Sequence, residues 1–232
     1  MSAPELNSIR QGALGGFLAA GASLVAGAGV MLFLRPGIPF VGLDLPGRMK
    51  YLADHQRGWT AGWLLAGLAA LALVNLYGVL AWRWRTRSSQ LCRLALILSA
   101  AGLAADLSGM AIWGLVAPGL EGAAFEVVEK TAVALIFFLS KILYTLSGVF
   151  LTIAGAREWP GWLVGLSAPV WISGALLGAA TLGQRALAQT WALYSLVAFF
   201  ILWSLLVGRW FLRQVLPPPD PAGSRFVPDP RD

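Results

Sequence analysis

The chain carries little charge and almost none of the side chains that bind metals or form disulfides. Charged residues make up only 12% of its 232 residues, about half the share of a typical soluble domain. The single cysteine, Cys92, excludes a disulfide within the chain, and the single histidine, His55, excludes bis-histidine haem ligation within one chain. A zinc site usually needs several such ligands. No metal site and no cofactor are therefore predicted.

Motifs of known catalysts are also missing. The sequence has no HExxH, GxSxG, Walker or glycine-rich dinucleotide motif. It has no convincing internal repeat, so it lacks the inverted-repeat pattern of many transporters. These absences remove the usual sequence evidence for a particular reaction or substrate.

Apolar residues are what the chain has in abundance. They make up 58% of the sequence, too much for the core of a soluble protein of this length. Six stretches of 20 or more mostly apolar residues are each long enough to cross about 30 Å of hydrocarbon. The sequence predicts an all-α polytopic membrane protein, a six-transmembrane-helix bundle formed by residues 1–216. The predicted spans are 11–34, 59–82, 95–116, 131–155, 162–182 and 188–207.

The two ends of the chain carry separate expectations. Residues 217–232 are rich in proline and polar residues and are predicted to be a mobile tail. At the other end, Arg10 precedes an apolar run, and Ala26-Gly27-Ala28 resembles a signal-peptide cleavage site, whose use would leave five spans. The apolar run continues well past that site, through residues 30–34, so we expect a retained first span.

Basic residues predict the orientation. If both termini are cytoplasmic, ten Lys and Arg residues lie in inner segments and six in outer segments, as the positive-inside rule prefers. The first outer loop carries four of the six and is the exception. The net charge of +6 is thus explained by topology. No basic stripe with interleaved aromatics indicates nucleic-acid binding. The predicted location is the cell membrane, in particular a bacterial inner membrane.

Two charged residues fall inside the predicted spans. Asp106 lies 13 residues from Arg93, about 20 Å from the inner end of its helix, and Lys141 lies 16 residues from Arg157, about 24 Å from the same side. An unpaired charge at this depth costs about 2.5–3.5 kcal/mol on insertion scales. Because a short loop joins the two helices, they should be antiparallel neighbours. We therefore expect Asp106 and Lys141 to pair.

Small and polar residues accompany each charge. Lys141, Tyr144 and Thr145 share one helical face, and Gly102 and Gly109 share the face of Asp106. Small residues allow close helix approach. The predicted polar centre contains Asp106, Lys141, Tyr144, Thr145 and, on the second span, Asn75. The pairs Gly12/Gly16 and Gly174/Gly178 predict close helix packing within the chain, with self-association as the alternative.

The polar centre permits two interpretations. Asp106 and Lys141 can neutralise each other as a structural clamp, or they can line a cavity for a proton, an ion or a polar substrate group. The second interpretation predicts a small-molecule or ion carrier, and the first fits an accessory subunit of a larger membrane complex. Apart from the lysine itself, nothing favours a retinal Schiff base. The predicted partners are the lipid bilayer and, for an accessory subunit, another membrane protein.

The first outer loop is the other candidate site. Asp54, His55 and Arg57 could support acid–base chemistry, which would make the protein a membrane enzyme with a site on its outer face. Residues 48–57 also predict a short interfacial helix with Met49, Leu52 and Ala53 facing lipid. In the third loop, Glu126, Glu129 and Lys130 have helical spacing and predict a solvated first turn.

Two segments resemble a known group of proteins. ADHQRGW at residues 53–59 and AADLSGM at residues 104–110 are similar to segments of uncharacterised bacterial multi-span integral membrane proteins. In that group an acid–histidine pair follows the first span and an aspartate interrupts the third. The resemblance implies a multi-span architecture and no activity.

Overall fold

Residues 3–215 of the chain are described by a computed structural model, and they are almost entirely helical. The predicted tail at 217–232 lies outside the described residues. Six helical segments are long and apolar enough to cross a membrane, which agrees with the predicted all-α six-helix membrane bundle. These segments are Leu6–Gly37, Gln56–Trp84, Ser89–Gly119, Gly122–Gly155, Gly161–Leu182 and Ala186–Gln214.

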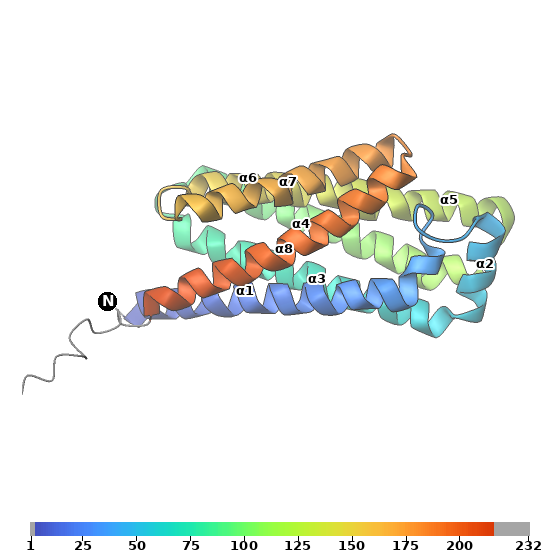
Figure 1. The fold of residues 1–232 in the computed structure, drawn as a ribbon, viewed down its shortest axis with the longest axis horizontal. Coiled ribbons are helices and arrows are strands. Elements are labelled where there is room, and N and C mark those ends of the chain that lie inside the picture. Colours follow the sequence, from blue (N-terminus) through green and yellow to red (C-terminus); the bar gives the residue numbers. More distant parts are fainter. Residues whose placement is uncertain (1–2, 216–232) are drawn as a thin grey trace, which may run out of the picture.

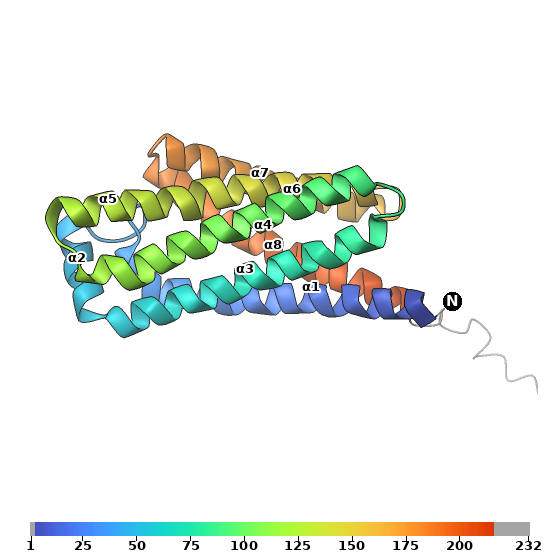
Figure 2. The same ribbon diagram turned by 180° about the vertical axis from the view of Figure 1, so that it is seen from behind.

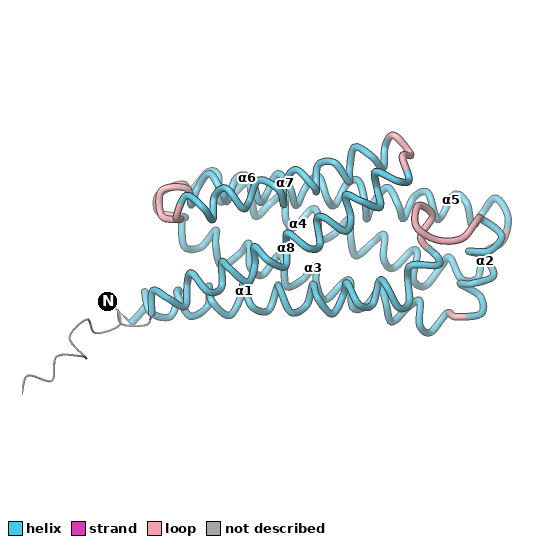
Figure 3. The backbone as a smooth tube through the Cα atoms, viewed as in Figure 1, coloured by secondary structure: helices cyan, strands magenta, loops and turns pink. Residues whose placement is uncertain are grey.

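Three of the six spans are a single α-helix, and the other three contain a π-helical segment. The α-helices are α1 (Ala3–Gly29), α2 (Leu45–Asp54), α3 (Gln56–Trp84), α4 (Ser89–Ala111), α5 (Gly122–Val133), α6 (Ser140–Gly155), α7 (Gly161–Leu182) and α8 (Ala186–Val215). The π-helical segments are η1 (Val30–Leu34), η3 (Ile112–Val116) and η5 (Ala134–Leu139). Short 3-10 turns follow η1 and η3, namely η2 (Arg35–Gly37) and η4 (Ala117–Gly119). In Figure 3 the loops lie at the two ends of the bundle.

The helices extend beyond several of the predicted spans. The largest difference is in the fourth span, where α5 begins at Gly122 instead of residue 131. The extra residues include Glu126 and Lys130, whose side chains form an exposed ion pair one turn apart, 2.6 Å between Lys130 Nζ and Glu126 Oε1. A helix can continue past the hydrocarbon layer where its exposed charges are paired in this way, so hydrophobicity alone places its start too late.

The six spans form a closed ring in chain order. α1 packs against α3, α3 against α4, α4 against α6, α6 against α7 and α7 against α8, and α8 returns to α1. Figures 1 and 2 show that α1 and α8 meet near the N-terminus and diverge toward the opposite end, where α2 lies. We call these the terminal end and the α2 end. Such a ring encloses a central space, which is either filled by side chains or left open as a cavity.

The contact between α1 and α8 depends on glycine. A Cβ atom on Gly16 would lie 2.6 Å from the backbone nitrogen of Gly208, and one on Gly12 would lie 2.6 Å from the ring of Phe211. The predicted pair Gly12/Gly16 therefore serves packing within the chain. Gly174 and Gly178 do the same on α7, where they face Thr145 and Ile142 of α6. All four glycines allow helix backbones to approach closely.

Buried aromatic residues gather in two clusters, one near each end. At the α2 end, Trp59 donates a hydrogen bond from Nε1 to the carbonyl oxygen of Trp113, at 2.8 Å, and both rings contact Trp63. At the terminal end, the ring of Trp84 packs edge-on against Trp159. Trp59, Trp113, Trp84 and Trp159 are all buried inside the protein, where they pack against other aromatic rings.

Candidate functional site

Asp106 of α4 and Lys141 of α6 are in contact between the two aromatic clusters. Lys141 Nζ donates to both carboxylate oxygens of Asp106, at 3.3 Å to Oδ1 and 3.2 Å to Oδ2. Ser140 Oγ also donates to Asp106 Oδ1, at 3.2 Å. The carboxylate is almost completely enclosed, whereas the lysine side chain keeps 18% of its surface accessible. Lys141 is therefore the more accessible residue of the pair.

Glycines beside Asp106 let α4 approach the helix that carries Lys141. A Cβ on Gly102 would lie 2.9 Å from Cε1 of Tyr144, and one on Gly109 would lie 2.6 Å from Cγ1 of Ile136. These glycines stand one turn before and after Asp106 on the same face. The close approach brings an enclosed carboxylate within reach of a lysine on the neighbouring helix.

A cavity of about 620 Å³ lies inside the ring, and Asp106 and Lys141 are on its wall. This volume is within the range of small-molecule binding sites. The wall is almost entirely apolar and includes small residues such as Ala66, Ala69 and Ala70 of α3. Two of the three π-helical segments, η1 and η5, also line it. The cavity thus combines an apolar interior with one charged pair, of which Lys141 is the more accessible member.

The mouth of the cavity lies between α1 and α8. Most lining residues are buried or partly buried. The solvent-exposed ones are Leu24, Ala28, Met31 and Ala198. The first three lie on α1 and η1 and the fourth on α8, all within candidate membrane spans. Figure 1 shows α1 and α8 diverging toward the α2 end from their contact near the N-terminus. A mouth at this position faces the acyl chains of a bilayer.

Tyr144 is enclosed beside the Asp106–Lys141 pair. It is only 5% exposed, and its hydroxyl oxygen has almost no accessible surface. The hydroxyl interacts with the Asp106 carboxylate, and Lys141 Nζ lies 5.4 Å from the centre of the Tyr144 ring. Tyr144 therefore belongs to the immediate surroundings of Asp106, and its hydroxyl is not exposed to the cavity.

Three of the other predicted site residues differ in their placement. Tyr144 and Thr145 line the cavity together with Asp106 and Lys141. Asn75, expected to face the same interior, is exposed and does not line the cavity. Its side chain lies beside Gly15 of α1 instead. The prediction for Asn75 is therefore wrong: α3 turns Tyr77, and not Asn75, toward the centre.

The outer-loop candidates do not form a site with one another. Asp54, His55 and Arg57 are all exposed, and no hydrogen bond or ion pair within residues 3–215 joins them. The His55 ring stacks on Tyr51, with 4.5 Å between ring centres, and its Nδ1 lies 3.2 Å from the Tyr51 carbonyl oxygen. Partial burial raises the pKa of the Tyr51 phenol. Nothing in this geometry activates an acid or a base.

The interfacial-helix prediction is wrong in its orientation. α2 lies across the end of the bundle and does not present its apolar face to lipid. Leu52 is fully buried, Met49 packs against the aromatic cluster of the α2 end, and only Ala53 is exposed as predicted. Asp44 begins α2 by accepting a hydrogen bond from the backbone nitrogen of Gly47, at 3.0 Å, and fixes where the helix turns inward.

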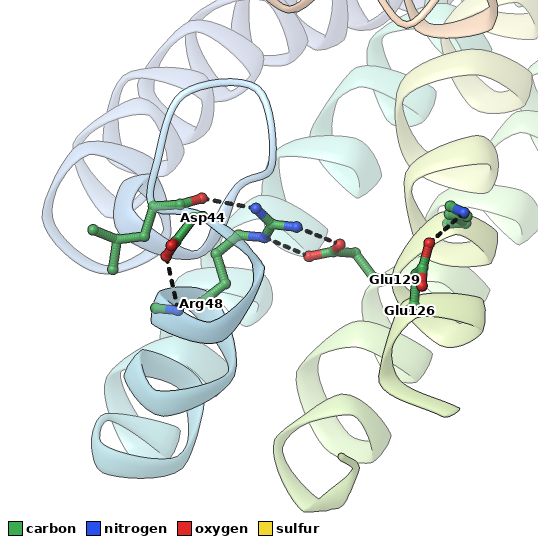
Figure 4. A network of polar contacts seen from close by, with 7 residues as sticks. Asp44, Arg48, Glu126 and Glu129 are labelled. Atoms are coloured by element: carbon green, nitrogen blue, oxygen red, sulfur yellow. Dashed lines mark hydrogen bonds and ion pairs between the residues drawn. The ribbon is translucent and has the colours of Figure 1, made fainter. Parts of the chain in front are cut away.

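A buried ion pair that the sequence analysis missed holds α2 in place. Arg48 donates to Glu129 of α5, from Nε to Oε1 at 2.8 Å and from Nη2 to Oε2 at 2.7 Å (Figure 4). A third donor, Nη1, binds the carbonyl oxygen of Leu43 at 2.7 Å. The prediction that Glu129 is solvated is therefore wrong, since it is only 4% exposed. The side chain of Glu126, in contrast, is 46% exposed and paired with Lys130.

No metal centre is evident in the described part of the chain, where no three His, Cys, Asp or Glu side chains gather closely enough to hold an ion. Comparison of the chain with protein-family models, curated proteins and solved structures finds no match in any of the three. The central cavity is thus the best-supported candidate site, and its chemistry follows from its own residues.

Proposed function

We propose that this multi-pass membrane protein binds a small lipid-soluble molecule in the central cavity, as the binding step of a carrier. The observation that carries the proposal is the position of the mouth. All exposed residues of the cavity wall belong to α1, η1 and α8, within the candidate spans. Molecules dissolved in the hydrocarbon layer therefore have the most direct access to the cavity.

The Asp106–Lys141 pair supports binding more than a purely structural clamp. A clamp requires only that the two charges satisfy each other, and it is best served by enclosing both. Here the lysine keeps part of its surface accessible and borders a cavity. An apolar pocket with a few convergent polar groups is the usual form of a small-molecule site.

The experiment is photolabelling of the full-length protein in lipid vesicles with a decyl diazirine probe. Saturable labelling of residues on the cavity wall, suppressed by excess undecane, is the expected result. Ala70→Phe places a ring in the cavity and should reduce this labelling strongly. Ala104→Phe is the matched control, because Ala104 is exposed on α4 and does not line the cavity.

Two results would contradict the proposal. One is labelling confined to lipid-facing residues with no saturation in the wild-type protein. The other is equal saturable labelling of the Ala70→Phe and Ala104→Phe variants. Either result, together with stable co-purification of a second membrane protein, favours the accessory-subunit alternative. A membrane enzyme acting at Asp54 and His55 has no support from the geometry of those exposed residues.

A further inference from the structure

The charge balance of the cavity restricts the ligand. Among the described residues of its wall, the charged ones are Asp106 and Lys141, which neutralise each other. A ligand with a net charge would bring an uncompensated charge into an apolar space, which is strongly unfavourable. An anion competing for Lys141 would also place two negative groups around one ammonium. The cavity is therefore suited to a neutral molecule.

Lys141 contributes a hydrogen-bond donor to the cavity. An ammonium has three N–H groups, and the two bonds from Lys141 to Asp106 leave at least one of them unused. The acceptor oxygens of Asp106 are enclosed and already receive bonds from Lys141 and Ser140. A ligand beside Lys141 would thus meet a donor that requires an acceptor.

We infer that the ligand is an uncharged, largely apolar molecule with a hydrogen-bond-accepting oxygen, which binds at the ammonium of Lys141. This inference rests on the proposed function and adds the chemical class of the ligand. The apolar part of the molecule occupies the space lined by α1, α3 and α8, and the oxygen lies near Lys141. A carbonyl or hydroxyl group on a hydrocarbon skeleton meets these requirements.

The test is competition against the decyl diazirine probe by four compounds of matched chain length in vesicles containing the wild-type protein. The four are undecane, methyl nonyl ketone, undecanoate and undecylamine, compared at matched membrane concentrations. We expect the ketone to compete about ten-fold or more better than undecane, the gain expected from one hydrogen bond to a charged donor. Neither charged compound should compete better than undecane.

Variants locate the effect on the lysine. In Asp106→Leu, Lys141→Leu, the preference for ketone over undecane should disappear. In Ala104→Phe, whose side chain lies outside the cavity, the preference should persist. Tyr144→Phe should also retain it, because the ammonium remains and the hydroxyl is not exposed to the cavity. The competition within the wild-type protein decides the inference even if the double variant does not fold.

The outcomes separate this inference from the proposed function. If the probe does not label the cavity saturably, the proposed function fails. If it labels saturably but the ketone is no better than undecane, or undecanoate is the best competitor, the ligand class is wrong while cavity binding stands. A ketone preference unchanged by removal of both charges would also overturn the role of Lys141.

Discussion

Arg48 and Glu129 lie 81 positions apart in the chain and form a two-pronged ion pair, with contacts of 2.7 and 2.8 Å. The pair joins the short helix α2 to α5 and is buried on both sides. It closes the α2 end of the bundle over the cluster of Trp59, Trp63 and Trp113. The contribution of this ion pair to the stability of the protein can be measured directly.

Removing one partner of this pair should destabilise the protein strongly. Glu129→Ala leaves the guanidinium of Arg48 without its main partner in a buried position, at a cost of about 3–5 kcal/mol. Unfolding of the purified protein followed by tryptophan fluorescence provides the measurement. The matched control is Glu126→Ala, which removes an exposed pair with Lys130 and should change stability by about 1 kcal/mol or less. Similar losses of stability in both variants would contradict the expected cost of leaving Arg48 buried without its partner.

The Asp106–Lys141 pair should behave as a unit. Asp106→Leu or Lys141→Leu alone leaves one charge orphaned near mid-membrane and should cost about 3–5 kcal/mol. The double variant removes both charges and should recover most of that loss. Stability of the three variants, measured by resistance to denaturing detergent, forms a double-mutant cycle. Additive losses would show that the contact contributes nothing.

Gly16 should not tolerate a side chain. Its Cβ would lie 2.6 Å from a backbone atom of Gly208, so Gly16→Ala forces α1 and α8 apart at their closest contact. We expect a loss of about 1–3 kcal/mol, typical of overpacking, visible as a lower unfolding temperature. Gly21→Ala, on the same helix, is the control, because a Cβ there meets nothing within 4 Å. If the two variants unfold at the same temperature, the crossing is not tight.

The predicted orientation can be tested with single cysteines. Ser89→Cys lies at an exposed site near the terminal end, and Glu121→Cys lies at an exposed site near the α2 end. The native Cys92 is buried and serves as an unreactive background. In intact cells, a membrane-impermeant maleimide should label Glu121→Cys and spare Ser89→Cys until the membrane is opened. The reverse pattern would place the termini outside.

The sequence predicted the helices and the central pair because both depend on local rules. Apolar runs of sufficient length must become membrane helices, and a short loop between two spans makes them antiparallel neighbours. Matching the depths of Asp106 and Lys141 along their helices was then enough to expect their contact, which the structure contains. Glycine spacing also predicted the close packing at Gly12 and Gly16.

What the sequence could not predict depends on helix rotation and on distant pairs. Asn75 and Tyr77 are two positions apart, so a modest rotation of α3 decides which of them faces the centre. Arg48 and Glu129 are each typical of exposed surface until the other is placed beside it. The cavity itself is lined by large apolar residues together with alanines of α1, α3 and α8, and alanines in a span also predict tight packing. Ser140, which also donates to Asp106, directly precedes Lys141 in the sequence, and this adjacency is the signal that indicates it.

A cavity mouth within the hydrocarbon layer changes how the affinity of the proposed ligand should be expressed. Since the exposed lining residues lie within the spans, occupancy of the cavity depends on the mole fraction of the ligand in lipid. Each added methylene favours partitioning into a membrane by about 0.8 kcal/mol, which raises apparent potency in water about fourfold with no new protein contact. Homologous compounds will therefore rank by tail length when potency is calculated from their concentration in water. The binding constant that reports contacts with the protein is the one calculated from the ligand concentration in lipid.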